Sequence, residues 1–406
     1  MLIHEYKLPN GLRIIHYPTA SPVVYSGFII NAGTRDEYPE EQGMAHFVEH
    51  MLFKGTTHRK AWHILNRLEA VGGELNAYTN KEETVVYNAF LPKDLSRALE
   101  LLVDIVFHST FPQKEIDKEV EVIIDEIESY LDTPSEQIFD DFEELMYPNH
   151  PLGHNILGKP ELLRTFKSED ALRFVKRYYQ PENMVLFLTG NVNTNRFFKL
   201  AEKLMKDIPS VPVIRETIAL PKYVPCEELR QISSNQSHVM LGCPAYDSHN
   251  ENRTTLYLLN NILGGPGMNS RLNVTLRERR GLVYQVESNI TSYTDTGLFS
   301  IYFGTAHEDV KRCLDYTYRE LDKLCQKPLS NLQLQAAKKQ LIGQIGVSSD
   351  NYESIILGVA KRYLNEGSVE SQSKLFERIQ NLTSQQIQDV AKEILNPKHL
   401  TKLQFG

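Results

Sequence analysis

The stretch ALRFVKRYYQPENMVLFLTG, residues 171–190, decides the fold prediction because the end of the chain repeats its pattern. The segment IQDVAKEILNPKHLTKLQFG (387–406) likewise combines an amphipathic helical pattern, a proline break and a short apolar strand pattern. Pro181 and Pro397 are 216 residues apart. A repeat with so long a period predicts two related halves that follow one another in the chain.

A second match supports the two halves. GFIINAGTRDE (27–37) aligns with HVMLGCPAYDS (238–248) at a shift of 211 residues. We therefore predict an α+β fold with two homologous α/β domains, each a mainly antiparallel sheet flanked by helices. Several prolines and a lack of helical periodicity predict a linker between them. The expected boundaries are a first domain at 1–208, a linker at 209–230 and a second domain at 231–406.

The composition is typical of a globular protein that is not inserted in a membrane. The chain has 406 residues, 41% apolar and 24% charged, and no run of 18 or more apolar residues. The amino-terminal residues 1–18 lack the features of a secretory signal and instead predict a hairpin around Asn10-Gly11. The four cysteines are scattered without a C-x-x-C pair, so we expect a reducing, cytoplasmic location.

The net charge of −8 is unevenly distributed along the chain. Residues 1–210 carry a net charge of −10 and residues 211–406 a net charge of +2. Within 115–144 there are 13 acidic residues and one lysine. A protein that binds nucleic acid would have the opposite sign, so we expect none as a partner. The acidic half would attract basic peptides, although a solvated acidic helix face explains the charge equally well.

The stretch GMAHFVEHMLFKGT (43–56) contains a candidate metal site. On a helix, His46 and His50 lie one turn apart on the same face, and Glu49 lies close to that face. Two neutral imidazoles can hold one zinc ion, and the carboxylate can take a proton from bound water. At the shift of 211 residues, the second half has YLLNNILGG (257–265), which lacks both histidines. Only the first half is therefore predicted to bind metal.

A catalytic zinc usually has a third protein ligand, and the acidic helix predicted at 114–131 offers candidates. Its apolar residues form a clean helical stripe. Glu119 and Glu126 lie along one edge of that stripe, and Glu121 and Glu128 lie along the other. Periodicity does not choose between the two pairs.

Two further histidines, His150 and His154, lie next to Pro151 and Gly153. This context predicts a loop, in which histidines are mostly solvated. We therefore do not expect them to bind metal.

The motif H-x-x-E-H, followed after His50 by 75 residues and then a glutamate, resembles the pitrilysin/insulinase family of zinc peptidases, the inverzincins. The resemblance covers essentially the whole chain, and the length is similar to that of the half-size, processing-peptidase-like branch. Further stretches that resemble the family are GGELNAYTNKEETVVYNAF (72–90), HPLGHNILGKPEL (150–162), LGGPGMNSRL (263–272) and SRLNVTLRERRGLVYQV (270–286).

The resemblance implies a zinc centre with assigned roles. His46, His50 and Glu126 would hold one Zn²⁺ per subunit. Glu49 would be the general base on the zinc-bound water, and Glu119 would be the supporting carboxylate.

The resemblance also implies residues that bind the substrate. Asn76 and Ala77 would lie on an edge strand that pairs with the substrate backbone. Tyr284 would donate a hydrogen bond to the developing oxyanion, and Arg277 would orient Tyr284 and the substrate. From position alone, Arg277 and Tyr284 are equally compatible with a surface helix end and an ordinary strand tyrosine.

The function implied by the resemblance is that of a zinc metalloendopeptidase acting on unfolded peptides. Because one chain carries both the histidine motif and the Arg277/Tyr284 element, we expect a homodimer with each site shared between subunits. Two alternatives have a different character: a structural relative of the same fold that lost catalysis, and a zinc-binding module without turnover. The intact histidine motif argues against the first alternative, and Glu49 beside the metal argues against the second.

Overall fold

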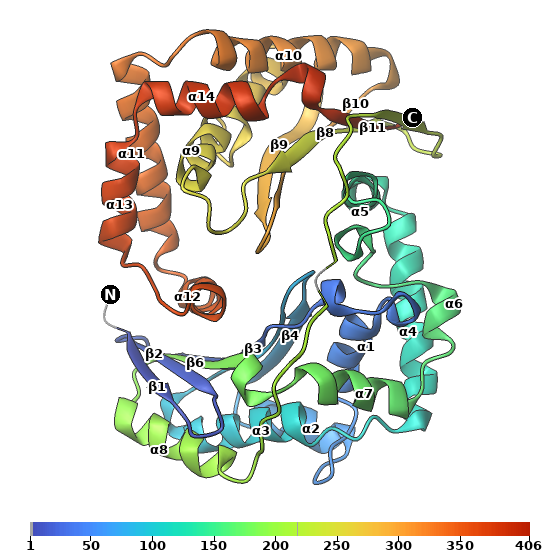
Figure 1. Ribbon diagram of the computed structural model, residues 1–406, viewed down its shortest axis with the longest axis vertical. Helices are drawn as coiled ribbons and strands as arrows, with labels where there is room; N and C mark the ends of the chain where they lie inside the picture. The colour runs from blue at the N-terminus through green and yellow to red at the C-terminus, as the bar shows by residue number, and fades with distance from the viewer. Residues whose placement is uncertain (1–2, 217) are drawn as a thin grey trace. The chain divides into compact units, whose positions relative to one another are not determined.

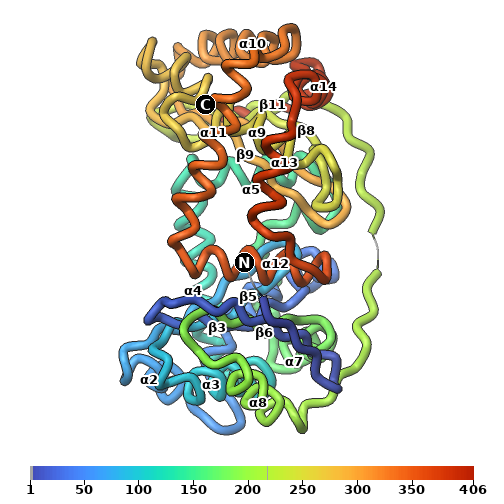
Figure 2. The backbone as a smooth tube through the Cα atoms, turned by 90° about the vertical axis from the view of Figure 1, so that its left-hand side faces the viewer, coloured from blue at the N-terminus to red at the C-terminus, as the bar shows by residue number. Residues whose placement is uncertain are grey.

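The computed structural model describes residues 3–216 and 218–406. They form two compact units, each built around one sheet (Figures 1 and 2). The first unit comprises Met1–Glu128, His150–Ala219 and Asn351–Val369. The second unit comprises Ser129–Asn149, Leu220–Asp350 and Glu370–Gly406. Each unit therefore contains one segment from the other half of the chain.

The sheet of the first unit has six strands in the order β1-β2-β6-β3-β5-β4. The strands are β1 (His4–Lys7), β2 (Arg13–Pro18), β3 (Val24–Ile30), β4 (Glu74–Thr79), β5 (Thr84–Phe90) and β6 (Met184–Gly190). All neighbouring strands are antiparallel except β2 and β6. β1 and β2 form the hairpin predicted around Asn10-Gly11, with Gly11 at a φ of 89°. β4 is an edge strand, as the resemblance implied.

The sheet of the second unit has five strands in the order β7-β11-β8-β10-β9. They are β7 (Glu227–Arg230), β8 (Ser237–Ala245), β9 (Val283–Ser292), β10 (Gly297–Thr305) and β11 (Thr401–Phe405). Only β7 and β11 pair in parallel. This order reproduces β2-β6-β3-β5-β4 of the first sheet strand for strand, so the predicted α+β fold of two related, mainly antiparallel halves is confirmed. Residues 227–230, at the end of the predicted linker, form β7.

The helices of the first unit pack mostly on one face of its sheet. They are α1 (Met44–Met51), α2 (Ala61–Glu69), α3 (Leu95–Phe107), α4 (Gln113–Leu131), α6 (Pro160–Leu163), α7 (Ser168–Tyr178) and α8 (Thr194–Met205). Strand β6 shows how the sheet is buried on both faces. Met184, Leu186 and Leu188 join the core that contains α1 and α3. Val185 and Phe187 point to the opposite face and join a second, smaller core.

That second core is completed by α12 (Tyr352–Glu366), a helix from the carboxy-terminal half of the chain. Ile356 and Ala360 are fully buried against the first sheet. Lys361 Nζ lies 2.6 Å from Glu83, and Tyr87 Oη donates to Glu353 over 2.8 Å. Figure 1 shows α12 on one face of this sheet and α3 and α8 on the other.

In the same way that α12 from the second half packs in the first unit, a helix from the first half packs in the second unit. α5 (Pro134–Met146) packs against β8 and β11. The other helices are α9 (Arg253–Gly264), α10 (Val310–Gln326), α11 (Asn331–Ser348), α13 (Gln372–Asn381) and α14 (Ser384–Ile394), with a π-helical turn at Asn273–Glu278. Within residues 3–216 and 218–406, no helix has both the length and the apolar character needed to cross a membrane.

Candidate metal centre

Helix α1 carries the two histidines and is almost entirely buried. Phe47, Val48 and Met51 pack into the main core and fix the rotation of the helix. The opposite side of the helix presents His46 and His50, whose ring centroids lie 4.5 Å apart. The one-turn spacing of the motif thus places both imidazoles side by side.

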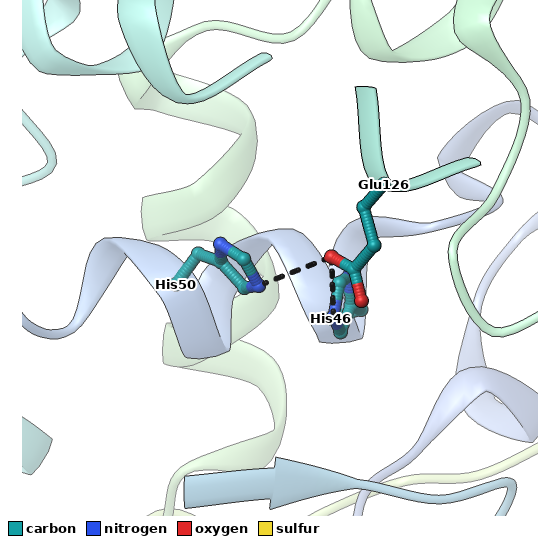
Figure 3. Close-up of side chains that lie close together, drawn as sticks. All are labelled: His46, His50 and Glu126. Carbon is teal, nitrogen blue, oxygen red and sulfur yellow. Dashed lines mark ion pairs between the residues drawn. The ribbon is translucent and has the colours of Figure 1, made fainter. Parts of the chain in front are cut away.

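Helix α4 supplies the third candidate ligand. His46 Nε2 lies 3.9 Å and His50 Nε2 lies 3.8 Å from the same oxygen of Glu126 (Figure 3). Bonds of about 2.0–2.2 Å to one tetrahedral ion would place such ligand atoms roughly 3.3 Å apart. The candidate ligand atoms of all three residues lie within 4.8 Å of one another, and the Glu126 side chain is partly exposed. Within the described ranges, these three residues are the one group of His, Cys, Asp or Glu side chains that can converge on a metal.

The packing of α4 resolves the choice between its two acidic edges. Glu119 is buried, and its Oε1 lies 3.0 Å from His50 Nδ1. Glu121 instead forms an exposed ion pair with Arg164 at 2.8 Å, and Glu128 is exposed. The edge with Glu119 and Glu126 therefore faces α1.

Glu119 orients His50 and is itself held by a cation. Its second oxygen lies 2.6 Å from Lys54 Nζ. Burial alone would raise the pKa of Glu119, but the hydrogen bonds from His50 and Lys54 outweigh it and lower that pKa. An ionised Glu119 accepts a hydrogen bond from the Nδ1–H group of His50, which selects the tautomer whose Nε2 is unprotonated and faces the metal position.

The donor set suits zinc chemically. Burial, with a smaller contribution from His50, lowers the pKa of His46 to about 3, so its ring is neutral and able to bind metal. Two neutral imidazoles and one carboxylate are a ligand set found in catalytic zinc sites.

Glu49 lies beside this group on α1. Its side chain is buried, and burial raises its pKa, while a hydrogen bond with Thr79 and the proximity of His50 act in the opposite direction. Its Oε2 has no hydrogen-bond partner among the described residues. Thr79 is the last residue of β4, so the candidate base is held against the end of the edge strand.

The residues expected to bind the substrate lie in two separate places. Asn76 and Ala77 lie on β4, in the same unit as the metal group. Arg277 and Tyr284 belong to the second unit, where the Arg277 guanidinium carbon lies 5.4 Å from the centre of the Tyr284 ring. Tyr284 is the second residue of the edge strand β9 and is 81% exposed. Both residues line a pocket of about 410 Å³ together with the glycine-rich segment 264–268.

Three outcomes were not foreseen from the sequence. His150 is buried rather than solvated, and its Nδ1 accepts a hydrogen bond from the Leu152 amide at 3.2 Å. That expectation was wrong because the loop folds into a short 3₁₀ turn that the histidine caps. Lys54 was missed because it lies beyond the end of α1, where helical periodicity no longer shows which way a side chain points. Thr79 was missed because no sequence pattern links a strand end to Glu49.

The chain resembles known zinc proteases over nearly its full length. The family described as "Insulinase (Peptidase family M16)" matches residues 14–160, and the "Peptidase M16 inactive domain" matches residues 165–341. The "Uncharacterized zinc protease YmxG" of Bacillus subtilis is 31% identical over 404 residues, which cover 99% of this chain and 98% of that protein. An "Uncharacterized zinc protease" of Rickettsia bellii is 31% identical over 392 residues, 96% of this chain and 94% of that protein.

Solved structures show the same fold at lower sequence identity. A protease from Helicobacter pylori has a TM-score of 0.94 at 21% identity and covers 100% of this chain and 99% of its own. A peptidase M16 inactive domain from Pseudomonas fluorescens has a TM-score of 0.92 at 20% identity, with 100% and 98% covered. These similarities extend over both units.

Proposed function

Since this chain belongs to the insulinase family of zinc proteases, peptidase family M16, we propose that it is a zinc-dependent endopeptidase that cleaves unfolded peptides or extended protein segments. The observation that carries the proposal is the convergence of His46, His50 and Glu126, with Glu49 beside them.

The first unit contains the groups that hydrolysis requires. Zinc bound by His46, His50 and Glu126 would polarise the scissile carbonyl and lower the pKa of a bound water molecule. Glu49 takes a proton from the attacking water and delivers it to the leaving amine. The raised pKa of Glu49 suits this exchange, because a base that also has to act as an acid works best with a pKa closer to neutrality.

The edge strand β4 is the proposed docking site for the substrate backbone. Its outer edge has no neighbouring strand in the sheet, so a peptide can add to it by main-chain hydrogen bonds. Asn76 and Ala77 lie at the middle of this strand. Thr79, the last residue of this strand, lies near the proposed base Glu49.

The second unit is proposed to complete the site of another subunit. Arg277 orients Tyr284, whose hydroxyl donates to the oxyanion that develops during attack. In the proposed homodimer, each site combines the zinc group of one subunit with Arg277 and Tyr284 from the other. The negative charge of the first half favours basic peptides as substrates.

A peptide-library digest combined with metal analysis tests the proposed function. The purified protein is expected to contain one zinc per chain and to cleave unstructured peptides at internal bonds. Removal of zinc with a chelator should abolish cleavage, and adding zinc back should restore it. Cleavage that persists in metal-free protein, or zinc-loaded protein that cleaves no member of a diverse library, would contradict the proposal.

A further inference from the structure

The zinc-binding helix has an acceptor for its first-turn amides that lies outside the H-x-x-E-H motif. The carboxylate of Glu37 is only 3% exposed and lies at the amino-terminal end of α1. One oxygen accepts a hydrogen bond from the Gly43 amide at 2.9 Å. The other accepts from the Ala45 amide at 2.8 Å, and Ala45 immediately precedes His46.

Helix α1 needs such an acceptor. It begins after Gly43, which has a φ of +94° and no side chain to cap the helix. The first amides of any helix lack partners within it, and a buried unpaired amide costs about 1–3 kcal/mol. An eight-residue helix has little stability of its own, so its orientation depends on contacts at its ends and along its buried face. Burial raises the pKa of Glu37 well above its usual value, and the hydrogen bonds from the Ala45 and Gly43 amides act in the opposite direction.

The loop that carries Glu37 is anchored to the turn after the edge strand β4. The Thr34 amide donates to the Asn80 carbonyl at 3.2 Å, and the Arg35 amide donates to the Lys81 carbonyl at 2.7 Å. Glu37 therefore connects the start of α1 to the end of β4 through a short, hydrogen-bonded path. At the other end of this arrangement, α1 contacts β4 directly, and Glu49 lies near Thr79 at the end of that strand.

The loop is also held on its other side. Tyr178 Oη donates to the Asp36 carbonyl at 2.6 Å, and the Asp36 carboxylate accepts from Arg215 at 2.8 Å. Hydrogen bonds to residues 34–36 thus hold the segment that immediately precedes Glu37. A rigid acceptor can set the position of the helix that it caps.

We propose that Glu37 is a positioning residue that fixes the zinc helix relative to the edge strand β4, so that the imidazole of His46 and the carboxylate of Glu49 are held in their working orientation. The effect on catalysis rests on the proposed peptidase function, whereas the effect on metal affinity does not. Glu37 does not touch the metal group itself.

The test compares Glu37→Gln and Glu37→Ala with a matched control, Glu41→Gln. Glu41 belongs to the same loop, is 4% exposed and pairs with Arg177 on α7, but it accepts no hydrogen bond from α1. Zinc affinity is measured by competition with a chelating dye. Amide hydrogen exchange at Ala45 and the steady-state rates of zinc-saturated protein are measured alongside it.

We expect Glu37→Ala to weaken zinc binding about tenfold or more, the usual effect of removing a group that supports metal ligands. The Ala45 amide should exchange faster, and kcat should fall with KM nearly unchanged because strand β4 is intact. Glu37→Gln keeps one acceptor oxygen and should give an intermediate loss. Glu41→Gln should leave zinc affinity and Ala45 exchange close to wild type.

Wild-type zinc affinity and Ala45 exchange in both Glu37 variants would overturn the positioning role. Equal losses in Glu37→Gln and Glu41→Gln would also overturn it, because the effect would then belong to the loop as a whole. If the wild-type protein binds zinc but cleaves no peptide, the peptidase proposal fails. The zinc-affinity comparison still decides the role of Glu37 in that case.

Discussion

At the scale of single residues, burial shifts the pKa values of two residues of α1 in opposite directions. It lowers the pKa of His46, with a contribution from His50, and it raises the pKa of Glu49. Desolvation disfavours the charged form of both groups, so the histidine remains neutral and the carboxylate binds a proton more readily. Burial of one helix thereby favours the protonation states that the proposed metal ligand and the proposed general base require.

Glu49→Gln is expected to retain zinc and lose peptide cleavage. The amide has nearly the shape of the carboxylate but cannot accept the proton of the attacking water. General-base catalysis typically contributes about 10²–10⁴-fold, so kcat should fall by at least two orders of magnitude. Zinc content and single-turnover cleavage of one peptide measure the two effects separately.

Glu128→Gln is a matched control for this change, because Glu128 is exposed on α4 and faces away from α1. It should cleave at the wild-type rate. Near-normal turnover in a well-folded, zinc-loaded Glu49→Gln protein would rule out Glu49 as the base.

His16 provides a pH-dependent contribution to the stability of the first unit. It is fully buried on β2, and its Nδ1 lies 2.8 Å from Thr194 Oγ1. Burial lowers its pKa from 6.5 to about 4, a direction to which His4 adds and which a backbone hydrogen bond with Gly190 opposes. The unfolded chain therefore binds more protons between these two values, and stability is lost as the pH falls from about 6.5 toward about 4.

His16→Gln should remove this dependence. Between pH 7 and pH 5, wild type is expected to lose up to about 2 kcal/mol more unfolding free energy than the variant, from the one-proton linkage relation. Urea unfolding of both proteins at the two pH values measures the difference and cancels the other titrating groups. An equal loss in both proteins would contradict the assignment.

The spacing of the motif was sufficient to predict the positions of His46, His50 and Glu49 on one helix. Helical periodicity could not select Glu126 over Glu128, because it describes the faces of α4 but not the neighbour of each face; the family resemblance implied Glu126. The roles of Glu37 and Lys54 could not be predicted from sequence patterns for a related reason. Their roles arise from contacts between segments that the sequence does not mark as neighbours.

At the scale of elements, the repeat predicted which segments of the two halves correspond to each other. It did not predict where every helix packs. The helix–proline–strand pattern correctly indicated α7 with β6 and α14 with β11. An apolar helical face shows that a helix is buried, but it does not show which sheet the helix covers. This is why the exchange of α5 and α12 between the halves was not visible in the sequence.

Ile356→Ala is expected to destabilise the zinc-bearing unit although the residue belongs to the second half of the chain. Ile356 is fully buried against Val185 and Phe187 of the first sheet. Truncation of a buried isoleucine to alanine typically costs about 2–5 kcal/mol. Urea unfolding, together with limited proteolysis of the first unit, measures the loss.

Leu332→Ala on α11 is the control, since Leu332 is 83% exposed and should change stability by less than about 0.5 kcal/mol. Proteolysis that increases only in the second unit of Ile356→Ala would show that α12 does not stabilise the first sheet.

At the scale of the whole molecule, the groups proposed for catalysis are divided between the two compact units. The metal group and Glu49 lie in the first unit, and Arg277 and Tyr284 lie in the second. The sheet of the second unit repeats the order of five of the six strands of the first, but the second unit has asparagines where the first has Glu49 and His50. In the proposed function, each unit would supply a different part of one catalytic site, and a two-fold dimer would contain two such sites.

Mixing two inactive variants tests whether each catalytic site combines residues from two subunits. Glu49→Gln lacks the base, and a variant with both Arg277→Ala and Tyr284→Phe lacks the oxyanion element. If each site is shared across a two-fold dimer, a hybrid regains one complete site, and an equal mixture should reach about a quarter of wild-type activity. Peptide turnover is followed after subunit exchange has been verified with two affinity tags.

A mixture of Glu49→Gln with His46→Ala is the control and should stay inactive, because both changes damage the zinc unit and no hybrid contains an intact one. Absence of recovery in the first mixture, with exchange complete, would place all catalytic groups of each site in a single chain.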